Sequence, residues 1–109
     1  MERPTSAPPS ARTWLDDYRR RIEAARVRAE QACARAGEVT ATAQTRDGAV
    51  AITVDASGAL TDVRFGARAG DLPLTRLAET VVRLAADAVT DARGQVEAIM
   101  EPLSAERPS

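Results

Sequence analysis

The sequence lacks lysine and histidine, contains one cysteine, and has only three aromatic residues, Trp14, Tyr18 and Phe65. Because histidine is the side chain that titrates near neutral pH, its absence removes the commonest general base. The lone cysteine, Cys33, can form no disulfide within the chain, and without histidine it cannot complete an ordinary zinc site. We therefore predict no enzymatic activity, no catalytic residue, no metal, no cofactor and no small-molecule substrate. We expect Cys33 to be a small buried residue.

The chain also lacks an apolar run long enough to cross a bilayer, so we predict no membrane association. Residues 1–10 carry Glu2, Arg3 and several prolines and serines where a targeting signal would have its apolar core, which predicts a cytoplasmic protein. Large apolar side chains are few among the 109 residues, and alanine and valine bury little area each. A second copy of the chain is a natural source of additional core, so we predict a homodimer.

Positive charge is concentrated at the N-terminal end. All 15 basic residues are arginine, and together with the abundant alanine this suggests a genome of high GC content. The net charge is −1, yet residues 1–37 hold eight arginines against five acids, a net +3. Residues 38–73 and 74–109 are each at −2. Any contact with a polyanion is therefore expected to involve the N-terminal segment.

The first long periodic segment predicts a helix that begins near Thr13 and ends at Gly37. It follows a polar leader, residues 1–12, which we expect to be disordered. Apolar residues recur along the helix in steps of three and four: Leu15, Tyr18, Ile22, Ala25, Ala29, Ala32 and Ala36. At about 1.5 Å per residue the helix is roughly 36 Å long, longer than a core of this size covers, so we expect part of it to project.

Two-residue alternation then predicts a three-stranded antiparallel meander. The strands are expected at Val39–Arg46, at Val50–Val54 after the turn Asp47-Gly48, and at Leu60–Phe65. A second amphipathic helix follows and is expected to close at Pro102; its apolar positions are Leu74, Leu77, Val81, Leu84, Ala88, Ala92, Val96 and Ile99. The predicted fold class is α+β, with helix, three-stranded meander and helix in one domain of residues 13–103, followed by a disordered tail at 104–109.

The stretches Gly48-Ala-Val-Ala-Ile-Thr-Val-Asp55 and Leu60-Thr-Asp-Val-Arg-Phe65, set between a charged helix and an amphipathic one, resemble the YbaB/EbfC family of nucleoid-associated proteins, in its actinobacterial type. The resemblance covers roughly Trp14 to Leu103. It implies a homodimer whose sheets and second helices share a core, while the first helices project as arms that grip DNA. It also implies a place in the nucleoid. Some relatives are linked to type VII secretion clusters, so a protein-interaction or scaffold module without DNA binding is the alternative function.

Arginines border the apolar stripe of the first helix, with Arg19 and Arg26 on one flank and Arg21, Arg28 and Arg35 on the other. Either carboxylates or phosphates could meet them, and guanidinium groups suit bidentate contact with phosphate. The carboxylates could come from the second helix: Glu79, Asp87, Asp91 and Glu97. A third reading is a solvated face with intrahelical pairs such as Arg19–Glu23 and Arg26–Glu30.

We therefore predict weak, largely sequence-independent contact with the DNA backbone, because no base-reading motif is present. The predicted DNA-binding residues are Arg19, Arg20, Arg21, Arg26, Arg28 and Arg35. Trp14 is expected to be a packing anchor. The residues predicted to pack in the core or the dimer are Trp14, Tyr18, Ile22, Ile52, Val54, Val63, Phe65, Leu77, Val81 and Leu84.

Overall fold

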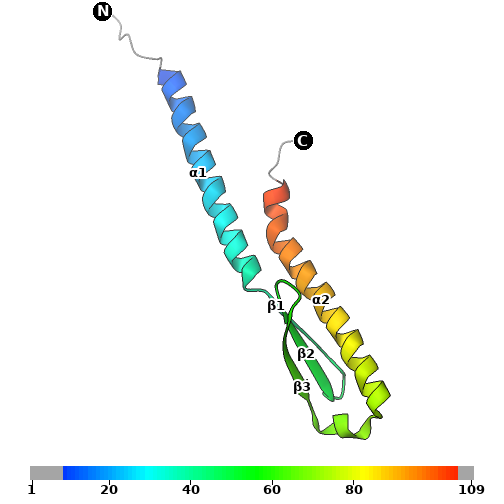
Figure 1. The fold of residues 1–109 in the computed structure, drawn as a ribbon. Coiled ribbons are helices and arrows are strands. Elements are labelled where there is room, and N and C mark those ends of the chain that lie inside the picture. Colours follow the sequence, from blue (N-terminus) through cyan, green and yellow to red (C-terminus); the bar gives the residue numbers. More distant parts are fainter. Residues whose placement is uncertain (1–8, 106–109) are drawn as a thin grey trace, which may run out of the picture. The chain divides into compact units, whose positions relative to one another are not determined.

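The computed structural model describes residues 9–105, with side chains at 10–104. The elements follow the order helix, three strands, a short 3-10 helix and a long helix (Figure 1). The fold class predicted from the sequence is therefore confirmed. Contacts divide the chain into two compact units, with the boundary inside the first helix after Gln31. Residues 1–8 of the predicted leader and 106–109 of the predicted tail lie outside the described residues, so their disorder stays a prediction. Residues 9–12 and 104–105 are helical instead.

Helix α1 spans Pro9–Gly37, so it begins four residues before the predicted start at Thr13. Proline is well tolerated in the first turn of a helix, because the N–H that it lacks would have no intrahelical acceptor there. The predicted end at Gly37 is confirmed. Beyond it, the N–H groups of Glu38 and Val39 donate to carbonyls three residues earlier, which closes the last turn.

Strands β1 (Thr40–Gln44), β2 (Val50–Asp55) and β3 (Leu60–Phe65) form one antiparallel sheet in the order β1-β2-β3. Burial in β2 alternates along the strand, with Val50, Ile52 and Val54 buried and the residues between them partly exposed. This is the period of two expected for a strand with one covered face. The register pairs Ile52 with Val63, so the third strand presents Val63 on that same face.

Carboxylates organise the two turns of the sheet. In the β1–β2 turn, Oδ1 of Asp47 accepts hydrogen bonds from the Thr45 hydroxyl at 2.8 Å and the Ala49 N–H at 3.0 Å. In the β2–β3 turn, Oδ1 of Asp55 accepts from the hydroxyl and the N–H of Ser57 at 2.6 and 2.9 Å. The Ala49 N–H lowers the pKa of Asp47, and the Ser57 hydroxyl lowers the pKa of Asp55, because each favours the ionised form.

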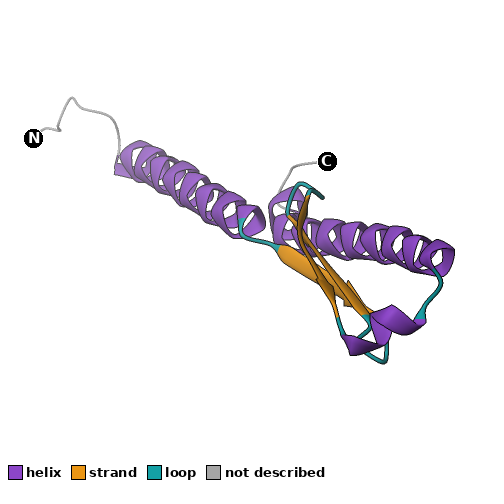
Figure 2. Cartoon of the chain, turned by 60° about the horizontal axis from the view of Figure 1, so that its bottom comes forward, coloured by secondary structure: helices purple, strands orange, loops and turns teal. Residues whose placement is uncertain are grey.

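Helix α2 spans Leu74–Ala105 and follows the 3-10 helix η1 (Ala67–Asp71). The predicted end at Pro102 is wrong, because Pro102 lies inside the last turns. The helix lies along one face of the sheet and packs on β1 and β2 (Figure 2). The buried cluster joins the β2 residues to three positions spaced by four on α2: Leu84, Ala88 and Ala92.

The predicted packing residues divide into three groups. Ile52, Val54 and Leu84 are buried. Val63, Leu77 and Val81 are partly buried and pack against the core. Trp14, Tyr18, Ile22 and Phe65 are exposed in the single chain, so a role for them in a dimer stays a prediction. Cys33 is exposed, and the expectation that it is buried was wrong.

Candidate nucleic-acid interface

The arginines predicted to bind DNA all lie on α1, and every one of them is exposed. Their positions follow from the helix period: residues seven apart lie close to one line along the helix. Arg19 and Arg26 therefore share one line, and Arg21, Arg28 and Arg35 share another. Between the two lines runs the apolar stripe predicted from the sequence.

The structure adds Arg12 to this arrangement. Arg12 lies in α1 because the helix begins at Pro9, and it is one seven-residue step before Arg19. Sequence reasoning missed it because it placed residue 12 in the leader. The signal was present in the spacing of Arg12, Arg19 and Arg26, which the predicted helix start cut short. Arg12 is exposed like the others.

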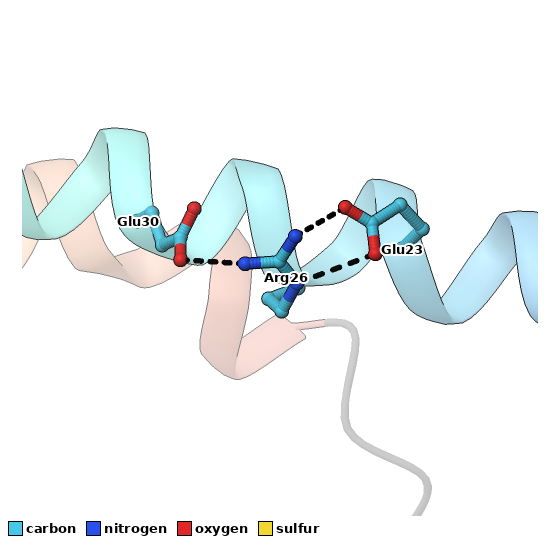
Figure 3. Close-up of polar contacts among 3 residues, drawn as sticks. All are labelled: Glu23, Arg26 and Glu30. Atoms are coloured by element: carbon cyan, nitrogen blue, oxygen red, sulfur yellow. Dashed lines mark hydrogen bonds and ion pairs between the residues drawn. The ribbon is translucent and has the colours of Figure 1, made fainter.

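Three carboxylates of α1 pair with two of its arginines. Arg26 lies between Glu23 and Glu30, donating to both Glu23 oxygens and to Oε2 of Glu30 at 2.8 Å (Figure 3). The hydrogen bonds that Arg26 donates to Glu23, together with the negative charge of that carboxylate, raise the pKa of Arg26. Arg20 pairs with Oδ1 of Asp17 at 3.1 Å. These are exposed pairs on one helix, a class that contributes little to stability and is screened by salt.

The pairing predicted from the sequence is confirmed for Arg26–Glu30 and wrong for Arg19–Glu23. Glu23 pairs with Arg26 instead. Arg28 has an interaction partner as well. Within residues 9–105, the arginines of α1 left without an ion pair are Arg12, Arg19, Arg21 and Arg35.

The stripe that the arginines border is also open to solvent. Trp14, Tyr18 and Ile22 are 60%, 47% and 53% exposed. The rings of Trp14 and Tyr18 stack, with centroids 5.5 Å apart and planes within 8° of parallel. Such an arrangement combines an apolar surface that another molecule can cover with flanking guanidinium groups that can donate hydrogen bonds to an anion.

Residues 9–105 contain no group of histidine, cysteine or acidic side chains placed to hold a metal ion. None of the helices there is long and apolar enough to cross a membrane.

Comparison with known proteins places the chain in a family. A search of curated proteins and a search of solved structures each found no match. Among family models, the one described as the YbaB/EbfC DNA-binding family matches residues 14–107. That family binds DNA and is not enzymatic. The match takes in the arginines of α1 from Arg19 onward, the whole sheet and all of α2. The chain therefore belongs to the YbaB/EbfC DNA-binding family.

Proposed function

We propose that this protein is a nucleoid-associated homodimer that binds duplex DNA weakly and without strict sequence preference, through arginines of α1. The observation that carries the proposal is the set of four exposed arginines on α1 that have no ion pair within residues 9–105. Because the chain belongs to a DNA-binding family, we take DNA as the ligand of these arginines. We place the protein in the nucleoid of the cytoplasm, and its arginine-only composition supports an actinobacterial-type member.

Unpaired guanidinium groups favour phosphate as the ligand. A guanidinium presents its donors in a planar fork that matches two phosphate oxygens, and it stays charged at every physiological pH. Arg12 and Arg19 lie on one line of the helix, and Arg21 and Arg35 lie on the other. Contacts with the phosphates of a DNA strand can therefore extend over several turns of α1. The paired Arg20 and Arg26 contribute less, because each must first release a carboxylate of its own helix before it can contact a phosphate.

The expected affinity is low and strongly dependent on salt. If each protomer makes about three phosphate contacts, the slope of log affinity against log salt is roughly −5, with dissociation constants of about micromolar or weaker. Phosphates are the same at every base pair, so contacts of this kind carry no sequence information. Sequence preference should therefore be slight.

Exposed apolar surface supports the homodimer. On the α2 side of the sheet, the helix covers β1 and β2, while Leu60 and Phe65 of β3 remain 53% and 57% exposed. Trp14 and Ile22 add apolar surface on α1. Clusters of this kind mark interaction surfaces in small proteins, and a second copy would supply the missing cover. Light scattering after size exclusion should give twice the mass of one 11.6 kDa chain.

The test of DNA binding is a gel shift at about 50 mM salt with micromolar protein and a random duplex. It compares the wild type with Arg19→Glu/Arg21→Glu and with a control of equal charge change, Arg64→Glu/Arg93→Glu, on exposed residues of β3 and α2. We expect the α1 variant to lose the shift and the control to keep most of it. No shift by the wild type, or equal shifts by the two variants, would refute the proposal.

The same exposed stripe favours a second candidate, a scaffold that binds another protein, for example as an accessory of a type VII secretion locus. The stacked Trp14 and Tyr18 support it, because exposed aromatic pairs are common at protein interfaces. The two candidates differ in the gel shift. A scaffold without DNA binding predicts no shift even at low salt.

A further inference from the structure

A hollow of about 360 Å³ lies beside the β1–β2 turn and the first turns of α2. Three arginines line it, and they come from two elements far apart in the sequence: Arg46 from the turn, and Arg76 and Arg83 from the helix. All three are exposed. Both elements belong to the same compact unit, so the fold itself brings these charges together.

The positive charge of the hollow is not balanced within the described chain. No guanidinium group of its three arginines has an ion pair or hydrogen bond to another side chain among residues 9–105. The one carboxylate in the lining, Asp47, already accepts two hydrogen bonds that hold the turn, and Arg68 interacts with its charge. The lining therefore holds three guanidinium groups and a single carboxylate, which has other partners.

The neighbouring polar groups leave the arginines as the available donors. Thr80 lines the hollow, but its hydroxyl donates to the carbonyl of Arg76 in its own helix at 2.9 Å. Among the described residues, the nearby α2 carboxylates Glu79 and Asp87 are outside the lining. The N-terminal end of α2 adds the positive end of a helix dipole to the same region. Each of these features favours an anionic ligand.

The spacing of the arginines favours a chain of phosphates over a single one. Arg76 and Arg83 are seven residues apart, so they lie about 10.5 Å apart along the helix axis. Successive phosphates of one DNA strand advance about 3.4 Å along the duplex axis, so this distance spans about three of them. A run of successive phosphates can therefore engage the two residues without their side chains converging on one ion.

We propose that this hollow is a second DNA-contact site, in which Arg46, Arg76 and Arg83 hold the sugar–phosphate backbone of one strand. The inference rests on the proposed function, since it takes duplex DNA as the ligand. It extends that function from α1 to the body formed by the sheet and α2, a part of the chain that carries a net negative charge. DNA contact there depends on the local cluster of arginines, which the net charge of the whole segment does not reveal.

The test measures fluorescence anisotropy of a labelled random duplex over a salt series, using the full chain. Arg76→Glu/Arg83→Glu is compared with Arg64→Glu/Arg93→Glu, which makes the same charge change away from the hollow. Losing two phosphate contacts should lower the slope of log affinity against log salt by about 1.8 per chain, or about 60-fold in affinity at 0.1 M salt if the curves converge near 1 M. The control should keep the wild-type slope.

The outcomes separate this inference from the proposed function. If Arg76→Glu/Arg83→Glu behaves like the control while Arg19→Glu/Arg21→Glu loses binding, the hollow is refuted and the proposed function stands. If the wild type does not bind, both fail. Arg76→Gln/Arg83→Gln, with circular dichroism of each variant, excludes misfolding as the cause of a loss. If inorganic phosphate raises the melting temperature of the wild type but not of Arg76→Gln/Arg83→Gln, while the two proteins bind duplex DNA equally, the hollow is a single-phosphate site and the proposal is overturned.

Discussion

Removing the two carboxylates that hold Arg26 should strengthen DNA binding. In Glu23→Gln/Glu30→Gln, the guanidinium of Arg26 loses both of its ionic partners and becomes available to phosphate. The glutamine side chains keep their length and can still accept a hydrogen bond, so the helix should persist. The change thus converts an occupied arginine into an available one with little effect on the fold.

The size of the gain follows from counting contacts. One additional phosphate contact per chain steepens the slope of log affinity against log salt by about 0.9. If the affinities of the variant and the wild type become equal near 1 M salt, the variant at 0.1 M salt binds about eightfold more tightly than the wild type for each chain that engages DNA. The gain should shrink steadily as salt is raised, because counterion release drives it.

The assay is anisotropy of a random duplex titrated with protein across a salt series, and the control is Glu79→Gln/Glu97→Gln on α2. The control changes the net charge equally but removes no carboxylate that is paired with an α1 arginine. General electrostatics predicts equal gains for the two variants. Equal gains with unchanged slopes, or no gain in the α1 variant, would refute the idea that Glu23 and Glu30 limit the contact made by Arg26.

Three further predictions concern stability, measured at fixed protein concentration. A methyl group in Gly66→Ala would lie 2.3 Å from a carbonyl oxygen of the β1–β2 turn, so we expect a loss of at least about 1–3 kcal/mol in urea unfolding. Gly70→Ala meets open space and should stay within about 0.5 kcal/mol; equal effects would contradict the close approach. Ile52→Ala removes a fully buried side chain and should cost about 2–5 kcal/mol, whereas a loss below 1 would place Ile52 outside the core. The lowered pKa values of Asp47 and Asp55 predict stability that is complete above the ordinary carboxyl pKa and declines as pH falls through the lowered values. Thermal unfolding against pH should show this decline, and Asp47→Asn/Asp55→Asn should reduce it.

The strands were predictable from the sequence because their signals are local. Alternation of Val50, Ile52 and Val54 after an Asp-Gly turn is explained by one covered face and one tight turn, and neither depends on distant residues. Helix ends were less predictable. Residues 9–12 were assigned to the leader and Pro102 to the end of the second helix, yet proline fits the first turn of α1, and α2 continues past Pro102.

The candidate site was predictable only in part. Spacing alone places the arginines on two lines of α1, but it allows Glu23 to pair with either Arg19 or Arg26. In the structure Glu23 pairs with Arg26, which lies between Glu23 and Glu30. The hollow could not be predicted in this way, because Arg46 and Arg76 are brought together only by the packing of α2 on the sheet.

Alanines on both sides of the contact between α2 and the sheet have a thermodynamic consequence. Ala41 on β1 and Ala88 and Ala92 on α2 are all at most 3% exposed, so much of the interior consists of single methyl groups. Unfolding such an interior hydrates little hydrocarbon, and the accompanying heat-capacity increment should be small for a chain of this length. A small increment flattens the curve of folding free energy against temperature. The protein should therefore resist cold and moderate warmth almost equally.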